Sequence, residues 1–335
     1  MTYDVHAHCA PQSFIDLLRV DGHQFGVEVV SGEKGETAVI ADRVKAGPIR
    51  PELVDLDRRL AVMDATGIDV QVLASWIDLT AYALEPEPGS RYARRFNQLL
   101  AEETNRAPGR FLALATVPLQ SPVLAAEELA FAVVELGMVG VEIATTVDGL
   151  DLDQAELDPF WSAAEELGCL VLIHPYAPLA GVDLSRYFLD NLVGRPAEST
   201  VTIASLMMSG LFDRYPHLKV VLCHGGGFLP FQLGRLERGF RAVPGRVAVA
   251  AVRPPAEVAG QLYYDTVLHS PQALRFLIDL VGPDHVLLGS DYPFEMGDPD
   301  PLQSLRVVPG LTEAEFQAVS SATFQSLSPD VRRET

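Results

Sequence analysis

Two hydrophobic patterns alternate along this chain of 335 residues. Short, nearly continuous apolar runs are typical of strands covered on both faces. Longer segments place apolar residues three and four positions apart, as on one face of a helix. The short runs predict strands that begin near residue 3 and at 69–74, 111–116, 139–144, 169–174, 218–224, 262–267 and 285–291.

The longer segments carry the start and stop signals of helices. Residues 51–66 open with a proline, place apolar residues on one helical face, and are followed by Gly67. Proline at a helix start and glycine just beyond its end are the usual boundary residues. The same reasoning predicts further helices at 90–107, 122–136, 156–167, 197–213, 228–240, 271–281 and 312–325.

Each of the eight predicted strands is followed by a predicted helix, with Gly, Pro and Asp at the junctions. This alternation predicts a (β/α)8 TIM barrel. An open doubly wound sheet is the alternative, but no G-x-G-x-x-G sequence follows the first strand to support it. We expect residues 1–335 to form a single domain. Within it, the glycine-rich, weakly periodic residues 20–50 are expected to be an inserted loop or hairpin.

The composition limits which binding partners and which cellular compartment we expect for this protein. The formal net charge of −20 disfavours nucleic acid and anionic membranes as partners. No apolar run is long enough for a transmembrane helix, and the first strand leaves no room for a signal peptide. The three cysteines, Cys9, Cys169 and Cys223, show no C-x-x-C spacing, which suits a reducing compartment. We therefore expect a cytoplasmic protein.

Histidines and one aspartate are concentrated where strands are predicted to end. His6 and His8 point to the same side of the first strand, as does Asp4, because side chains alternate with period 2. His174 and Asp291 each end a later predicted strand, and His224 does the same before Gly225–Gly227. Chemistry in a TIM barrel sits at these strand ends. Three histidines and an aspartate suit Zn²⁺ or a similar divalent ion, with a position left for water or substrate.

Each of these residues also has an ordinary structural explanation. A single histidine after a strand often caps or packs, and Asp291 in G-S-D-Y-P is a natural turn residue. The glycines after His224 are explained by a tight connection alone. Five such residues on one rim are explained better by a shared site than by five separate accidents.

Several other catalytic arrangements are not found in the sequence. The strand at 139–144 ends without a lysine, so a carbamylated lysine bridging two metals is not expected. Glu142, in the middle of this strand, could approach a metal, but we assign it to an internal hydrogen bond. No G-x-S-x-G sequence occurs. Cys9 and Cys223 alternate to the side opposite the neighbouring histidines, so we interpret them as packing residues.

Four motifs, in this order, resemble the metal-dependent decarboxylase branch of the amidohydrolase superfamily. They are the H-x-H near the N-terminus, I-H-P at 173–175, C-H-G-G-G at 223–227 and G-S-D-Y-P-F at 289–294. The branch is typified by aminocarboxymuconate semialdehyde decarboxylase and γ-resorcylate decarboxylase. Similarity to the former extends along the chain, in RFLALATVPLQSP (110–122), VGRPAEST (193–200) and FQLGRLERGF (231–240).

The resemblance implies metal ligands at His6, His8, His174 and Asp291, and a catalytic acid or base at His224. It implies one divalent ion per chain, for which we predict Zn²⁺ ahead of Mn²⁺.

The resemblance also implies that Arg235 binds a substrate carboxylate. Arg235 lies eleven residues beyond His224, too far along a helix to return easily to its own metal. We therefore predict a homodimer in which Arg235 reaches the other subunit's pocket. The alternative for this residue is a surface ion pair with Glu237 or Asp213.

The predicted substrate pocket departs from the family pattern. Tyr176 stands where the semialdehyde decarboxylase usually has tryptophan, and the arginine of the loop before the first helix has no clear match. Arg43 and Arg50 are the nearby candidates for that arginine. We predict Tyr176 and Arg50 as substrate-binding residues, while the metal site is intact.

These features predict a metal-dependent, non-oxidative decarboxylase of a small unsaturated or aromatic carboxylic acid. The expected chemistry uses a metal-bound water or a metal-bound substrate, with His224 as acid or base and Asp291 as a second proton carrier. The alternative is a hydrolase or hydratase that uses the same site on a C–C, lactone or amide substrate. A non-catalytic barrel is disfavoured because none of the five site residues is missing.

Overall fold

The computed structural model describes residues 1–154, 156–176, 179 and 181–328. Its main feature is one sheet of eight strands in which each strand lies parallel to its neighbours. In sheet order they are β1 (Tyr3–Cys9), β5 (Val70–Ser75), β6 (Phe111–Ala115), β7 (Gly140–Ala144), β10 (Leu170–His174), β11 (Lys219–Leu222), β12 (Tyr263–Asp265) and β13 (Val286–Leu287).

The first strand also meets the chain at the end of the last one. Ala7 forms a parallel bridge with Tyr292. Val5 N donates to Leu288 O at 2.9 Å, and His8 N donates to Tyr292 O at 2.7 Å. These contacts bring the two edges of the sheet together. The predicted (β/α)8 TIM barrel is confirmed.

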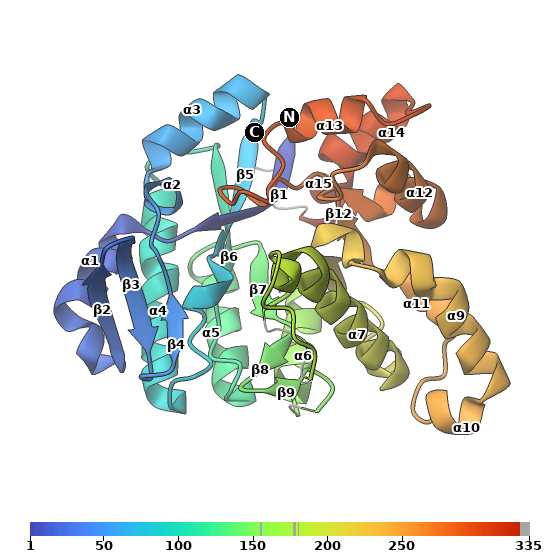
Figure 1. Cartoon of the computed structure of the whole chain (residues 1–335), viewed down its shortest axis with the longest axis horizontal. Coiled ribbons are helices and arrows are strands. Elements are labelled where there is room, and N and C mark those ends of the chain that lie inside the picture. The colour runs from blue at the N-terminus through green and yellow to red at the C-terminus, as the bar shows by residue number, and fades with distance from the viewer. Residues whose placement is uncertain (155, 177–178, 180, 329–335) are drawn as a thin grey trace.

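Helices connect the strands and cover the outside of the barrel (Figure 1). In chain order they are α1 (Gln12–Asp21), α2 (Pro51–Val54), α3 (Leu56–Thr66), α4 (Pro86–Thr104), α5 (Pro122–Val134), α6 (Asp158–Leu167), α7 (Arg195–Met208), α8 (Leu211–Arg214), α9 (Leu229–Ala242), α10 (Pro244–Val247), α11 (Pro255–Ala259), α12 (Pro271–Val281), α13 (Pro301–Arg306), α14 (Glu313–Gln317) and α15 (Thr323–Leu327).

Two segments predicted as single helices are interrupted by a non-helical residue, and a third, 312–325, continues through a π-helical stretch at Ala318–Ala322 between α14 and α15. The helix predicted at 51–66 breaks at Asp55, whose carboxylate accepts a hydrogen bond from Arg58 N at 3.0 Å and so caps α3. The helix predicted at 197–213 breaks at Gly210, which has a φ of 71°. Both interruptions come from single residues with cap or turn geometry inside a continuous apolar pattern.

The insertion after β1 forms its own small antiparallel sheet. Its strands are β2 (Val27–Gly32), β3 (Gly35–Ile40) and β4 (Val44–Ala46). This sheet lies within the range predicted as an inserted loop or hairpin and has one strand more than a hairpin. It stands beside the barrel, at the side away from α9 and α10 (Figure 1).

Two predicted strands end early, just before residues of the predicted site. β11 ends at Leu222 and β13 at Leu287, whereas the apolar pattern continues to His224 and Asp291. His224 and Asp291 have φ values of 54° and 56°. This left-handed backbone is unusual for residues other than glycine. The chain therefore turns sharply at both positions, next to the barrel mouth.

The opposite end of the barrel is closed by apolar packing. Phe324 and Leu327 of α15 join the same buried cluster as strand residues such as Val72 and Leu172. The rings of Tyr3 and Phe324 have centroids 4.9 Å apart. This apolar floor leaves the other end of the barrel for polar side chains.

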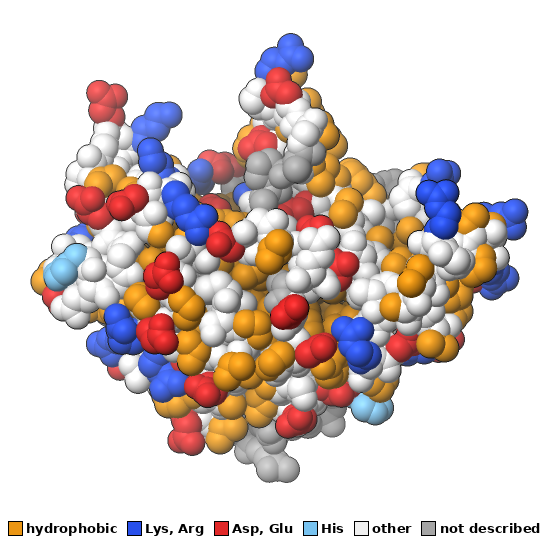
Figure 2. All heavy atoms as spheres, turned by 90° about the horizontal axis from the view of Figure 1, so that it is seen from below, with side chains coloured by type: hydrophobic (Ala, Val, Ile, Leu, Met, Phe, Trp, Pro, Cys, Tyr) orange, Lys and Arg blue, Asp and Glu red, His pale blue; other side chains and the backbone are white. Residues whose placement is uncertain are grey.

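Charged side chains are dispersed on the face seen from below, where acidic and basic groups lie singly among apolar ones (Figure 2). The net charge of −20 is thus not gathered in one patch on that face. Within the part of the chain that the structure describes, no helix is both long enough and apolar enough to cross a membrane.

Candidate metal centre

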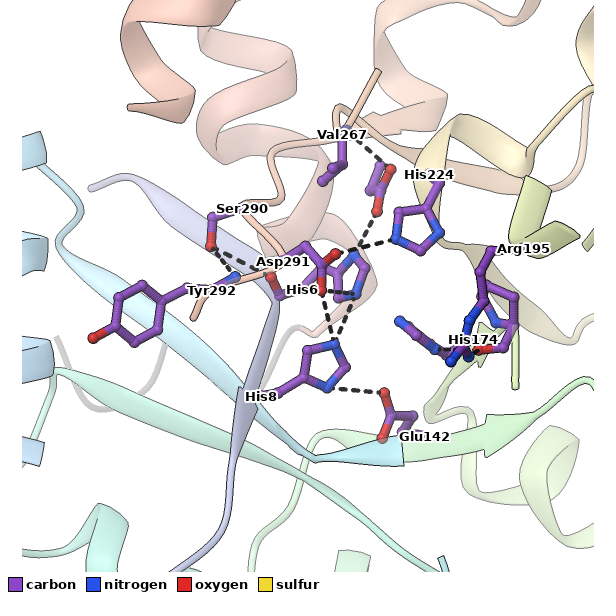
Figure 3. Close-up of polar contacts among 12 residues, drawn as sticks. His6, His8, Glu142, His174, Arg195, His224, Val267, Ser290, Asp291 and Tyr292 are labelled. Carbon is purple, nitrogen blue, oxygen red and sulfur yellow. Dashed lines mark hydrogen bonds and ion pairs between the residues drawn. The ribbon is translucent and has the colours of Figure 1, made fainter. Parts of the chain in front are cut away.

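Four predicted ligand side chains converge at the barrel mouth: His6, His8, His174 and Asp291 (Figure 3). The Nε2 atoms of His6 and His8 lie 3.1 Å apart. Asp291 Oδ1 lies 3.5 Å from His6 Nε2 and 3.1 Å from His8 Nε2. All four ligand atoms lie within 4.8 Å of one another, and all four residues are buried. Atoms bound about 2.1 Å from one tetrahedral ion lie about 3.4 Å apart, so this spacing fits one small divalent ion.

The three imidazoles are oriented by acceptors outside the cluster. In each ring Nδ1 faces an oxygen, which assigns the proton to Nδ1 and leaves a lone pair on Nε2. The three pairs are His6 with Asp265 Oδ2 (2.6 Å), His8 with Ser75 O (2.9 Å) and His174 with Pro175 O (2.8 Å).

This donor set concentrates hydrogen-bond acceptors around one point. Three Nε2 lone pairs and a carboxylate face one point. His174 Nε2 and Asp291 Oδ1 are fully buried and have no hydrogen-bond partner among the described residues. Buried acceptors without donors are costly. A bound cation satisfies all four at once, so the residues fit a divalent metal.

The electrostatics of the cluster also favour a positive charge. Burial opposes the charge on His8, but Asp291 and Glu142 outweigh burial and raise the pKa of His8 to about 9. Burial opposes ionisation of Asp291 too, yet the surrounding imidazoles hold its pKa well below its usual range. Burial, helped by the neighbouring imidazoles, lowers the pKa of His174 well below its ordinary value. The cluster thus favours a positive charge beside the ionised carboxylate of Asp291, which a divalent ion would supply.

His224 lies beside this cluster and faces the open side. Its Nε2 is 3.3 Å from Asp291 Oδ2, and its side chain is 19% exposed. Its Nδ1 has no hydrogen-bond partner among the described residues. The turn that carries it needs glycine: Gly227 has a φ of 65°, and a Cβ there would lie 2.1 Å from Pro196 O. The glycines therefore allow His224 to reach the site.

A cavity of about 510 Å³ opens above the cluster and reaches His174, His224 and Asp291. This is the size of a small-molecule site. Its apolar wall includes Trp76, Ile77, Phe188, Leu192, Phe228, Leu268 and Phe294. Its polar wall includes Arg50, Asp78, Asn191, Arg195, His269 and Glu295.

A profile of the amidohydrolase family matches residues 3–323. The chain belongs to this family. It is 32% identical over 330 residues to 2-amino-3-carboxymuconate-6-semialdehyde decarboxylase from Dictyostelium discoideum, which covers 98% of this chain and 92% of the relative. The predicted resemblance is confirmed at the level of the family.

Solved structures of decarboxylases have the same fold as this amidohydrolase. The 5-carboxyvanillate decarboxylase from Sphingomonas paucimobilis superposes with a TM-score of 0.83 at 28% identity, covering 98% of each chain. A dihydroxybenzoic acid decarboxylase from a Polaromonas species, with bound manganese and the inhibitor 2-nitroresorcinol, gives a TM-score of 0.77 at 26% identity. That match covers 98% of this chain and 96% of the other.

Asp265 is a site residue that sequence reasoning missed. Besides accepting from His6, its carboxylate accepts from Gly225 N at 2.7 Å and Val267 N at 3.1 Å. Burial opposes ionisation of Asp265, but the hydrogen bond from His6 and the electrostatic attraction of the same ring keep the pKa of Asp265 below its usual value. The only signal in the sequence is an acidic residue within an apolar strand. Asp265 joins a ligand of this amidohydrolase to the turn that carries His224.

Two predictions made for residues near the ligands are wrong. Asp4, predicted to point to the same side of the strand as His6 and His8, lies outside the ligand group, and the pairing of β1 with β5 is irregular between Asp4 and Ala7. Its carboxylate instead accepts hydrogen bonds from Gln71 at 2.7 Å and Ser290 at 2.5 Å. Glu142, predicted to form an internal hydrogen bond, has no hydrogen-bond partner in the described chain; its buried carboxylate instead lies 3.5 Å from His8 Nδ1 (Figure 3). Burial raises its pKa to about 8.

A second group, His6, Cys223 and Asp265, brings possible ligand atoms within 4.8 Å of one another. Its His6 nitrogen is the one already bonded to Asp265. Burial raises the pKa of the Cys223 thiol well above its ordinary value, so the thiol stays neutral and is a poor ligand. We therefore interpret Asp265 as the residue that orients His6 in the first site, and we do not interpret this group as a second metal site. Cys9 and Cys223 are both buried, unpaired thiols.

Arg50, Arg43 and Tyr176, the candidate substrate residues before α7, lie in different places. Arg50 lines the cavity and pairs with Glu295 at 2.7 Å. Arg43 pairs with Asp148 at 2.7 Å and does not line it. Tyr176 is half-buried against the apolar core, with its backbone N donating to Glu198 at 2.9 Å, and it is not among the residues that line the cavity.

Arg235 is exposed on α9 and does not line the cavity of its own chain. Its two suggested surface partners are bound elsewhere: Glu237 pairs with Arg241 and Asp213 pairs with Arg253. Within the described residues, no ion pair involves Arg235.

Proposed function

We propose that this amidohydrolase is a metal-dependent, non-oxidative decarboxylase of a small aromatic or unsaturated carboxylic acid. The observation that carries the proposal is the buried set of three histidines and one aspartate below a small-molecule cavity, with His224 beside it. The relatives described above are named decarboxylases and match nearly the whole chain. No specific observation favours hydrolysis or hydration.

The proposed cofactor is one divalent ion per chain, Zn²⁺ ahead of Mn²⁺, held by His6, His8, His174 and Asp291. Nitrogen and carboxylate donors in a four-atom cluster suit Zn²⁺. Manganese is the second choice because a related decarboxylase structure contains it. The three unpaired cysteines support a cytoplasmic location as part of this proposal.

Decarboxylation breaks the bond between the carboxyl carbon and the neighbouring carbon, and the electron pair stays on that carbon. A divalent ion at the site supplies a Lewis acid that polarises a substrate oxygen. The chain must then deliver one proton to the carbon. His224 faces the cavity and holds its Nε2 3.3 Å from Asp291 Oδ2, so we assign it the role of acid and base. Asp291 is the second proton carrier. The apolar wall, which includes Trp76 and Phe294, limits access of water.

We assign binding of the substrate carboxylate to Arg50 of the same chain and to Arg235 of a second copy of the chain. The proposed homodimer is supported by the surface around Arg235. Phe231 is one helical turn earlier on α9 and is 81% exposed. Large exposed aromatic side chains are typical of interaction surfaces. The guanidinium of Arg235 lies on the same helix as Phe231, has no ion-pair partner among the described residues, and is available to a neighbouring subunit.

The test is a screen of carboxylated phenols and muconate semialdehydes in ¹⁸O-labelled water with the zinc-loaded protein. Carbon dioxide and the remaining product are both measured by mass spectrometry. Decarboxylation releases one CO2 per acid consumed and places no ¹⁸O in the remaining product. Incorporation of ¹⁸O without CO2 release would identify a hydrolase or hydratase instead and reject the proposal.

A further inference from the structure

Arg195 is an arginine of the cavity wall that the function described so far does not use. It begins α7, and one of its terminal nitrogens, Nη1, donates to Pro175 O. The same carbonyl accepts from Nδ1 of His174 at 2.8 Å. The guanidinium is therefore held next to a predicted metal ligand, as Figure 3 shows.

The other edge of this guanidinium is free. Within the described residues, the hydrogen bond from Nη1 to Pro175 O is the one hydrogen bond of the Arg195 guanidinium, and no ion pair involves it. The other arginine of the cavity wall, Arg50, is paired with Glu295 at 2.7 Å. The Nε–Nη2 edge of arginine matches a carboxylate with two parallel hydrogen bonds. Arg195 is thus the cavity arginine with an unoccupied carboxylate-binding edge.

Asp78 supplies the opposite charge in the same cavity. It lies in the single helical turn Ile77–Leu79 after β5. Both side chains line the same cavity, and no ion pair joins Asp78 to Arg195 in the described chain. The space between them suits a ligand with an anionic group at one end and a hydrogen-bond donor at the other.

Arg195 is better suited to binding an acidic group that stays on the product than to binding the carboxylate that leaves as CO2. A carboxylate that leaves as CO2 loses its negative charge in the reaction, so a strong ion pair to it stabilises the starting state more than the transition state. An ion pair to a retained group stabilises both states equally.

We propose that Arg195 and Asp78 determine which acids this protein accepts. Arg195 binds a second acidic group that remains on the product, and Asp78 accepts a hydrogen bond from a hydroxyl or amino group on the same molecule. The substrate class is thus a hydroxy- or amino-substituted unsaturated or aromatic diacid. This inference rests on the proposed function for the identity of the cavity as the substrate site.

Binding of four small acids to the zinc-loaded protein tests the inference without turnover. Calorimetry compares benzoate with isophthalate, and isophthalate with its 4-hydroxy and 5-hydroxy derivatives. The wild-type protein is expected to prefer isophthalate to benzoate by about 10-fold or more, the range for a hydrogen bond to a charged group. It is expected to prefer at least one hydroxyisophthalate over isophthalate.

Each variant should remove one preference only. Arg195→Met removes the preference for the diacid and keeps the preference for the hydroxyl group, while Asp78→Asn does the reverse. Arg195→Lys, which keeps the charge without the fork, restores part of the diacid preference. Arg91→Met on the exposed face of α4 is the matched control and keeps both preferences.

The outcomes separate the two proposals. Equal binding of benzoate and isophthalate by the wild-type protein, or wild-type preferences in both Arg195→Met and Asp78→Asn, overturns the specificity proposal. Preferences that follow the variants as described, without CO2 release from any acid, support it and reject the decarboxylase instead. Melting temperatures of all variants identify any change that comes from misfolding.

Discussion

His6 Nδ1 lies 2.6 Å from Asp265 Oδ2, and both side chains are completely buried. The same carboxylate accepts a hydrogen bond from Gly225 N, next to His224. One buried acid therefore orients a predicted metal ligand and fixes the turn of the proposed proton carrier. Such outer partners of metal-bound histidines set the ring orientation and raise the basicity of the ligand.

We expect Asp265→Asn to weaken metal binding by about 10- to 100-fold, the usual effect of losing such a partner. An amide has one acceptor oxygen, whereas His6, Gly225 and Val267 all donate to this carboxylate. Competition with a chelator measures the affinity for Zn²⁺. Asp64→Asn, at an acid whose side chain is 67% exposed, is the control. Wild-type affinity in Asp265→Asn would show that this carboxylate does not orient the ligand.

Replacing His224 separates a proton carrier from a metal ligand. His224→Ala should retain about one ion per chain, because the four-atom donor set does not include this ring. Turnover should fall by about 10²- to 10⁴-fold, the contribution of a positioned acid or base. Elemental analysis and CO2 release measure the two effects, with exposed His217→Ala as the control. Loss of the metal together with the imidazole would make His224 a ligand.

Arg235 is expected to act on the other subunit of a homodimer. Chains carrying Arg235→Ala and His224→Ala should each have little activity alone. In a mixed dimer, one site combines an intact His224 with an intact Arg235 from the partner chain, so part of the activity returns. Activity is measured after mixing, with subunit exchange checked by native mass spectrometry. If exchange occurs and activity does not return, Arg235 has no role across an interface.

The three cysteines should be unreactive in the folded protein. Burial raises the pKa of Cys9 to about 11 and that of Cys169 to about 12, and it raises the pKa of Cys223 well above the ordinary value. Since the thiolate is the reactive form, iodoacetamide at pH 8 should label none of them until denaturant is added. Mass spectrometry of the intact chain counts the labels. Rapid labelling of the folded chain would contradict the burial of the three thiols and the assignment of Cys9 and Cys223 as packing residues.

The barrel and the ligand positions can be predicted because both depend on local patterns. Apolar runs identify the strands, and the residue at the end of each run identifies the rim. His174 needs no knowledge of its partners to be placed there. His6 and His8 follow from alternation within one strand, and Asp291 follows from the last predicted strand.

The rest of the site depends on contacts between distant segments. Asp265 meets His6 across 259 positions of sequence, and Arg195 reaches the carbonyl beside His174 from another element. Neither contact leaves a local pattern. Alternation also fails at Asp4, where an irregular pairing with β5 interrupts the period. The early ends of β11 and β13 likewise come from turns that the apolar runs do not record.

Titration of the metal-free protein with Zn²⁺, while CO2 release from an acid identified in the screen is recorded, tests the central claim most directly. We predict no release without metal, a linear increase with added Zn²⁺, and a plateau at one ion per chain. Asp291→Asn should shift or abolish the plateau because it weakens one of the four ligands. CO2 release by the metal-free protein, or a plateau of bound zinc without CO2 release, would contradict the account.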